Sequence, residues 1–163
     1  MAQGSSRSRG IRRARPNEVD EIRSLIVESM GYWDHSPEYL AEAEELMSLD
    51  ADDLARDEAF VLTIGTELAA FYRISLHGVV AEIEEMHVRP LWIGQGCGRA
   101  LFEHAVHRAA QRGATTLRWS TERYALGFYL RMGGHTVGTE PSGIAGEEPP
   151  TVMEFPVLAR KPV

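Results

Sequence analysis

Three glycines at alternate positions, Gly94, Gly96 and Gly98, form the stretch of this sequence best suited to bind a phosphate group. They follow a run of strand-forming residues that ends at Pro90, because proline cannot donate to a strand ladder. A run with the apolar spacing of a helix comes next. Glycines let the backbone approach phosphate oxygens, and the first N–H groups of a helix are unpaired and partly positive. The spacing predicts a phosphate-binding turn, with a tight turn that binds no ligand as the simpler alternative.

Two common phosphate motifs do not match this turn. A Walker A loop requires Gly-Lys followed by Ser or Thr, whereas Gly98 is followed by Arg99 and Ala100. A dinucleotide-binding fingerprint requires G-x-G-x-x-G, and its last position falls on Arg99 or Leu101, depending on which glycine opens it. The turn therefore belongs to another kind of phosphate site.

The stretch resembles the acetyl-CoA loop of the GNAT superfamily of N-acetyltransferases, which reads Arg/Gln-x-x-Gly-x-Gly/Ala after a strand that ends in Val. Here Val88 ends the strand and Gly96-Cys97-Gly98 supplies the Gly-x-Gly. Ile93 stands at the first motif position, so this chain lacks a side-chain donor to the pyrophosphate there.

A second resemblance lies nearer the C-terminus, where the family has Ala-x-x-x-Tyr-x-x-x-Gly. Ala125, Tyr129 and Gly133 match this motif. The family more often has Asn at the position of Glu122. By the resemblance, Tyr129 is the general acid that protonates the departing CoA sulfur; a tyrosine that only packs in the core is the alternative.

The resemblance also implies acetyl-CoA as the co-substrate. Backbone groups around residues 86–88 would hold the pantetheine and the thioester carbonyl, and the glycine loop would hold the pyrophosphate. Packing is the expected role of the cysteine in this loop, rather than nucleophilic catalysis. The expected cofactor-binding residues are Met86, His87, Val88, Ile93, Gly94, Gln95, Gly96, Cys97, Gly98, Arg99, Phe128 and Arg131.

The general base is expected on the strand before the loop. Family members that use a side chain there place it at positions that correspond to Glu82 and Glu84. The period of two puts both on one face of the strand unless a bulge intervenes, and puts Glu85 on the other face. A chain of water molecules is the alternative base.

By the resemblance, the acceptor pocket is formed by the loop between the first two helices and by the loop at 141–150. The first of these carries Tyr32, Trp33, Asp34 and His35, and aromatic rings beside acids suit a cationic amine. The alternative is that the aromatic residues only cover the core.

The elements expected around these residues follow the order βααβββαβαββ, which resembles the order of the GNAT family. The expected class is α/β (α+β): a GNAT fold with a mixed, mostly antiparallel sheet of about seven strands, about four helices and a V-shaped opening for acetyl-CoA. Residues 1–10 are expected to be a disordered tail and residues 11–163 one acetyltransferase domain. Strands are expected at 11–15, 59–64, 68–76, 79–88, 115–120, 135–138 and 151–158. Helices are expected at 17–29, 37–47, 99–112 and 124–132, with a short helical turn at 50–57.

Composition sets further limits on function. The 163 residues carry a net charge of −7, which disfavours nucleic-acid binding, and no apolar run is long enough to span a membrane. One cysteine fits a reducing compartment, so we expect a cytoplasmic location. The histidines show no metal-ligand spacing, so no metal is expected, and His104 and His107 are assigned to the polar side of their helix. A homodimer remains open.

The sequence therefore predicts an N-acetyltransferase that transfers an acetyl group to the primary amine of a small molecule by direct attack. A protein or peptide N-acetyltransferase is the alternative within enzymes. A non-catalytic acyl-CoA-binding module is the alternative from another class.

Overall fold

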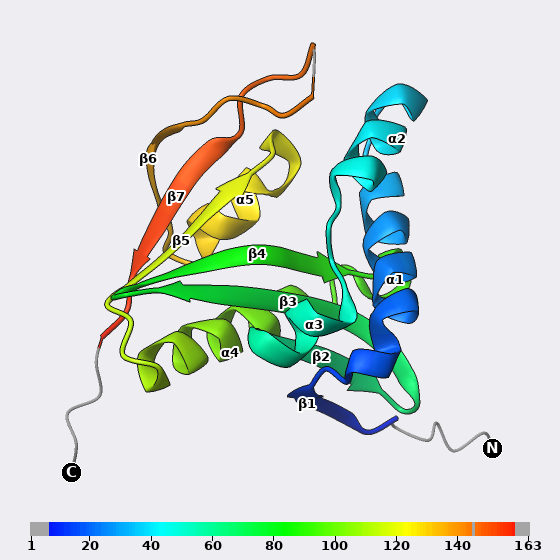
Figure 1. Ribbon diagram of the computed structural model, residues 1–163, viewed down its shortest axis with the longest axis vertical. Coiled ribbons are helices and arrows are strands. Elements are labelled where there is room, and N and C mark those ends of the chain that lie inside the picture. Colours follow the sequence, from blue (N-terminus) through cyan, green and yellow to red (C-terminus); the bar gives the residue numbers. More distant parts are fainter. Residues whose placement is uncertain (1–6, 145, 159–163) are drawn as a thin grey trace.

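The computed structural model describes residues 7–144 and 146–158. Within them, seven strands form one sheet in the order β1-β2-β3-β4-β5-β7-β6 (Figure 1). Only the pairing of β4 with β5 is parallel. This confirms the predicted mixed, mostly antiparallel sheet. The strands are β1 (Arg9–Arg13), β2 (Glu58–Ile64), β3 (Glu67–His77), β4 (Val80–Val88), β5 (Thr116–Thr121), β6 (His135–Thr139) and β7 (Thr151–Pro156).

Five α-helices lie within the described residues: the four expected helices and the short helical turn expected at 50–57, which forms a helix of its own. Ser36 caps the second helix as its type suggests: its hydroxyl accepts a hydrogen bond from the Tyr39 N–H at 3.0 Å. The helices are α1 (Val19–Gly31), α2 (Pro37–Leu46), α3 (Ala51–Arg56), α4 (Cys97–Gln111) and α5 (Arg123–Arg131).

The N-terminal elements differ from the expectation in two ways. β1 begins at Arg9, two residues earlier than predicted, so Arg9 and Gly10 belong to the sheet. A 3₁₀ turn at Pro16–Glu18 precedes α1, and the Glu18 carboxylate accepts the Arg15 N–H at 2.8 Å. Glu18 therefore closes the 3₁₀ turn, and its side chain makes no cap hydrogen bond to α1. Residues 1–6 of the predicted tail lie outside the described residues.

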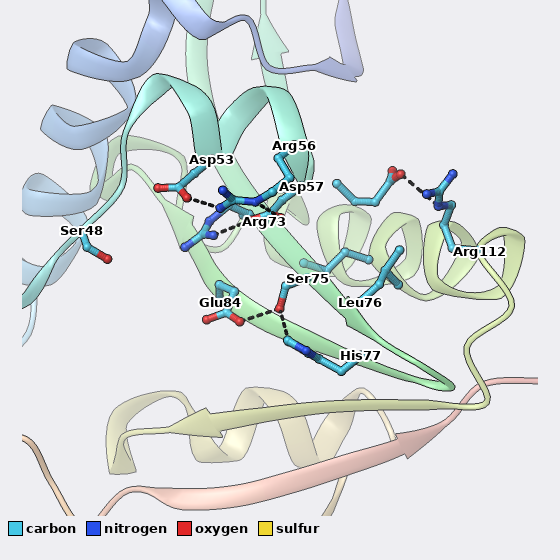
Figure 2. Close-up of a pocket in the computed structure, with 12 residues that line it drawn as sticks. Ser48, Asp53, Arg56, Asp57, Arg73, Ser75, Leu76, His77, Glu84 and Arg112 are labelled. Atoms are coloured by element: carbon cyan, nitrogen blue, oxygen red, sulfur yellow. Dashed lines mark hydrogen bonds and ion pairs between the residues drawn. The ribbon is translucent and has the colours of Figure 1, made fainter.

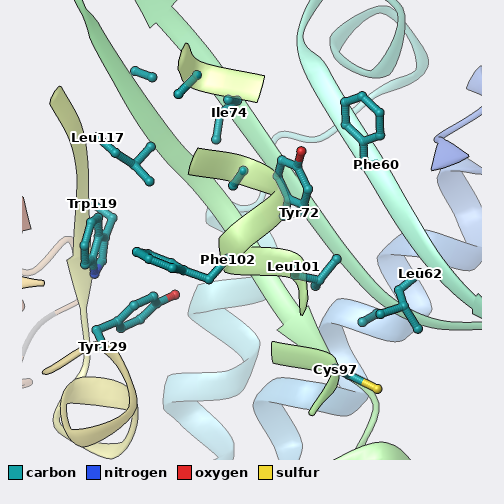
Figure 3. Close-up of a cluster of buried hydrophobic side chains, with 14 of the residues drawn as sticks. Phe60, Leu62, Tyr72, Ile74, Cys97, Leu101, Phe102, Leu117, Trp119 and Tyr129 are labelled. Atoms are coloured by element: carbon teal, nitrogen blue, oxygen red, sulfur yellow. The ribbon is translucent and has the colours of Figure 1, made fainter. Parts of the chain in front are cut away.

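The two faces of the sheet carry separate apolar cores. On one face, α1 and α3 bury Ile22, Leu25 and Leu54 against Phe71 and other residues of β2 and β3. On the other face, α4 packs its buried side, with Leu101 and Phe102, against the sheet and α5 (Figure 3). Helices therefore cover both faces of the sheet, each over its own apolar core.

His104 is half-buried and packs against this second core, contrary to the prediction that it faces solvent. Its Nδ1 lies 2.6 Å from the Tyr72 hydroxyl, and its ring lies 4.6 Å from that of Phe60. Tyr72 is fully buried, so its hydroxyl needs a partner, and the helix presents His104 to it. Tertiary packing thus overrides the polar pattern of the helix.

β4 and β5 separate soon after they pair. Their parallel ladder joins only Val80–Glu82 to Thr116–Arg118, and the strands then diverge (Figure 1). The rest of β4, up to Val88, keeps its pairing with β3 on the other side. The predicted V-shaped opening is present, and along 83–88 the edge of β4 that faces it pairs with no strand of the described residues.

No helix within the described residues is both long enough and apolar enough to cross a membrane.

The contact between Gly134 and Trp119 gives a test of the packing behind the opening. A Cβ on Gly134 would lie 2.8 Å from Trp119 Cζ2, and the buried indole cannot move away easily. Gly134→Ala should therefore lower the free energy of unfolding by about 1–3 kcal/mol, measured by chemical denaturation. Gly31→Ala is the matched control, because no atom lies within 4 Å of its Cβ. Equal stability of the two variants would contradict the packing described here.

Candidate active site

The glycine loop joins β4 to α4 as the sequence predicts. Gly94 and Gly96 have φ values of +79° and +82°, which other residues rarely adopt, and an added Cβ would meet open space at both. The backbone N–H groups of residues 94–99 donate no hydrogen bond to any described residue. Six adjacent N–H groups are therefore free to bind an anion at the start of a helix.

The remaining residues predicted for this loop divide into buried and exposed groups. Cys97 is buried and packs in the core, while Ile93 and Arg99 are exposed. Gly98 lies under Phe128, since a Cβ there would be 3.2 Å from Phe128 Cζ. Phe128 thus covers the first turn of α4, and Arg131, on the last turn of α5, is exposed.

On β4, Met86 and Val88 direct their side chains into the core with α4. Only their backbone can serve a ligand in the opening, as the resemblance implies. His87 faces α1, where its Nδ1 lies 3.3 Å from the Ser29 hydroxyl. Burial lowers the pKa of His87 to about 4, so the ring is neutral at pH 7.

Tyr129 lies at the back of the opening, among aromatic rings (Figure 3). Its ring centroid is 4.9 Å from that of Trp119, 5.1 Å from Phe128 and 6.1 Å from Phe102. Its hydroxyl has no hydrogen-bond partner among the described residues, and burial raises its pKa. The phenol is therefore protonated at neutral pH and has its proton available to a ligand.

A bulge in β4 decides where its glutamates point. Arg73 pairs with Glu85 and Ile74 with Ile83, so Glu84 is the extra residue. Because the bulge resets the alternation, Glu85 lies on the same face as Glu82, contrary to the prediction. Arg73 holds Glu85 through Nε at 2.7 Å, and burial raises the pKa of Glu85 against the opposing effect of Arg73. Glu85 is therefore committed to an ion pair.

Glu82 and Glu84 come together as predicted. Their carboxylate oxygens and a ring nitrogen of His77 all lie within 4.8 Å of one another. The Ser75 hydroxyl donates to Glu84 at 2.6 Å and lies 3.0 Å from His77 Nε2 (Figure 2). Three such donors could ligate an ion, so the prediction that no metal is needed stays untested. Glu84 lines a hollow of about 590 Å³ beside α3, which none of residues 32–35 lines.

The segment 32–39 contacts the junction of β5 and α5 rather than the hollow beside α3. His35 Nε2 lies 2.8 Å from the Glu122 carboxylate, and the Tyr39 hydroxyl donates to the same carboxylate at 2.7 Å. The Tyr124 hydroxyl donates to the Asp34 carbonyl at 2.9 Å, and the Trp33 ring stacks on Tyr124. The α1–α2 connection thus reaches across the wide end of the opening.

Glu122 and Tyr124 are not among the predicted site residues. Glu122 departs from the family motif, and its contact with Tyr39 spans 83 residues. No local pattern signals a contact at that separation. The departure itself, a carboxylate in place of an amide, was the available signal.

The acetyltransferase (GNAT) family model matches residues 19–134, most of the chain. The chain belongs to the GNAT acetyltransferase family.

Solved GNAT structures share its fold at low sequence identity. The PaiA N-acetyltransferase of Thermoplasma acidophilum, in complex with coenzyme A, has a TM-score of 0.78 at 17% identity, over 91% of this chain and 99% of that one. Nourseothricin acetyltransferase has a TM-score of 0.70 at 23% identity, over 92% and 99%. The ribosomal-protein-S18-alanine N-acetyltransferase of Escherichia coli has 0.69 at 20% identity, over 92% and 94%. A search of curated proteins found no match.

The neutral His87 of this GNAT protein gives a pH-dependent prediction. Its folded pKa, about 4, lies below the ordinary 6.5, so its contribution to stability is complete above pH 6.5 and is lost as the pH falls toward 4. Between about pH 7 and about pH 4.5, the loss from this group should be about 2–3 kcal/mol. His87→Gln should remove that part of the loss, measured by chemical denaturation at both pH values.

The control is His135→Gln, which changes an exposed histidine. It should follow the pH dependence of the wild type. If His87→Gln loses as much stability on acidification as the wild type does, the buried neutral ring is not what the fold depends on.

Proposed function

We propose that this GNAT acetyltransferase uses acetyl-CoA to acetylate the primary amine of a small molecule by direct attack in a ternary complex. The observation that carries the proposal is the diverging pair of β4 and β5, with free N–H groups of residues 94–99 at its wide end. The chain's own groups fit such a ligand: an unpaired strand edge for the pantetheine, and an anion site with open space above Gly94 and Gly96 for the pyrophosphate.

Acetyl-CoA, when bound, supplies the acetyl group as a thioester. Tyr129 then acts as the general acid, because its protonated phenol can donate to the thiolate that departs from the carbonyl carbon. Glu82 or Glu84 acts as the base that takes the proton from the acceptor ammonium, directly or through water. The acceptor nitrogen forms the new bond to carbon as the carbon–sulfur bond breaks.

A small acceptor is favoured by the way the wide end of the opening is closed. Residues 33–35 and 39 are joined to Glu122 and Tyr124 by two hydrogen bonds, the close contact of His35 with the Glu122 carboxylate and a ring stack. An extended polypeptide would have to displace these contacts, whereas a small amine need not. The family assignment makes the chain an acetyltransferase, so a non-catalytic module is not pursued.

A protein or peptide acceptor is the second candidate. It is favoured by the likeness in fold to the ribosomal-protein-S18-alanine N-acetyltransferase of Escherichia coli. That likeness covers 92% of this chain, but at 20% identity it concerns the fold alone.

An acceptor panel tests the proposal. CoA release from acetyl-CoA should be measured with arylalkylamines, polyamines, acidic amino acids, and peptides that carry a free N-terminus or a lysine. Because Glu82 and Glu84 are the proposed bases and Asp34 lies in the segment that crosses the opening, small cationic amines should have the highest kcat/KM. Faster turnover of peptides would favour the second candidate, and faster turnover of acidic amino acids would contradict the proposed acceptor class.

Tyr129→Phe tests the acid, because it keeps the packed ring and removes only the hydroxyl. The rate of acetyl transfer should fall by roughly 10²–10⁴, while the affinity for acetyl-CoA stays near that of the wild type. The measurement is a single turnover with enzyme in excess over acetyl-CoA, so that product release cannot hide the chemical step. An unchanged single-turnover rate would remove Tyr129 from the mechanism.

Glu82→Gln and Glu84→Gln test the base. The variant that removes the base should lose the acidic limb of the pH–rate profile, and the other should keep it. Wild-type profiles in both variants would assign the proton transfer to water.

A further inference from the structure

The side chain of Arg9 extends from the edge strand of the sheet to the glycine loop. It opens β1, the edge strand, and pairs there with Ile64 of β2. Its Nη1 donates to the Gln95 carbonyl at 3.0 Å, and its Nη2 donates to the Cys97 Sγ at 2.9 Å. These contacts span 86 and 88 residues of sequence.

Arg9 differs from its neighbours in what it binds. Arg7, Arg12 and Arg13 all lie near carboxylates, those of Glu67, Glu18 and Glu58 in turn. Among the described residues, Arg9 makes no ion pair and donates only to a carbonyl and a thiol. Its positive charge therefore stays uncompensated beside the start of α4.

The bond to Gln95 fixes the direction of one loop N–H. The Gln95 carbonyl and the Gly96 N–H belong to the same peptide unit, which is trans, so the two groups point in opposite directions. With the carbonyl held toward Arg9, the Gly96 N–H points away from it. Glycines are the most freely rotating residues of a chain. Gly96 forms one end of this unit and Gly94 lies one residue before it, so the loop would otherwise have little to hold its orientation.

We propose that Arg9 is a positioning residue for pyrophosphate recognition: it aims the Gly96 N–H outward and supplies the positive charge that Ile93 does not. Ile93 stands where the family motif has Arg or Gln, and it carries no donor. Arg9 acts from beneath the loop, through the backbone, rather than by direct contact with the ligand. This inference rests on the proposed use of acetyl-CoA and deepens it.

The test compares Arg9→Met with Arg7→Met. Methionine keeps the length of the apolar stem and removes the charge and the donors. Arg7 lies two residues away, is exposed, and faces Glu67 at 3.9 Å rather than the loop. CoA affinity should be measured by isothermal titration calorimetry at several salt concentrations. Arg9→Met should weaken CoA binding by roughly 10–100-fold and flatten its salt dependence. Arg7→Met should stay within about twofold of the wild type.

A donor without the pyrophosphate separates positioning from general damage. Acetyl-pantetheine carries the thioester but no phosphate, so Arg9→Met should use it with the same kcat/KM as the wild type. Wild-type affinity for CoA in Arg9→Met would overturn the inference, and so would an equal loss with acetyl-pantetheine. A wild-type enzyme that binds no CoA would instead overturn the proposed function.

Arg9→Lys serves if the methionine variant does not fold. Lysine keeps the charge but cannot span the Gln95 carbonyl and the Cys97 sulfur together. It should keep the wild-type salt dependence and show weaker CoA binding. Full wild-type affinity in Arg9→Lys would show that the fixed peptide is not needed, against the inference.

Discussion

The early end of the ladder between β4 and β5 is the constraint on which the rest of this structure depends. β4 stays paired with β3 up to Val88, and β5 stays paired with β7 over its whole length. The parallel seam between them joins only Val80–Glu82 to Thr116–Arg118, so the sheet consists of two antiparallel halves held together at one end. A strand edge that is left unpaired in the interior carries backbone groups that need partners. An extended ligand with amide groups can supply them, which is why the opening suits pantetheine in the proposed reaction.

Side chains bound the opening on two sides but leave room in it for a ligand. Behind it, Phe102, Trp119 and Tyr129 form an aromatic wall, and Gly134 leaves the room that the indole needs. In front of it, the segment 32–39 is held by Glu122, whose carboxylate binds both His35 and Tyr39. The same wall that supports the fold therefore gives Tyr129 a dry environment, and burial keeps its phenol protonated. The burial that packs the Tyr129 ring also raises the pKa of its hydroxyl.

The sequence predicted the features that local chemistry determines. Alternating glycines, a strand-ending proline and helix periodicity placed the loop and α4, although α4 begins at Cys97 rather than after Gly98. The features it missed depend on distant contacts. Glu85 turned to the other face because β4 pairs with β3 through a bulge. His104 turned inward because Tyr72, 32 residues away, needs a partner. Glu122 and Arg9 act across more than 80 residues, and no periodicity records such a contact.

The distribution of charge gives the two ends of the proposed site opposite roles. A chain with a net charge of −7 repels an anionic co-substrate at long range, so positive potential has to be concentrated where the phosphates bind. The free N–H groups at 94–99 and the uncompensated Arg9 provide that concentration. On the acceptor side, Arg73 neutralises Glu85 but no cation within the described residues pairs with Glu82 or Glu84. In the proposed reaction, these two carboxylates favour a cationic amine, while the positive groups around the glycine loop favour the phosphates of the co-substrate, so charge directs each substrate to its own end of the site.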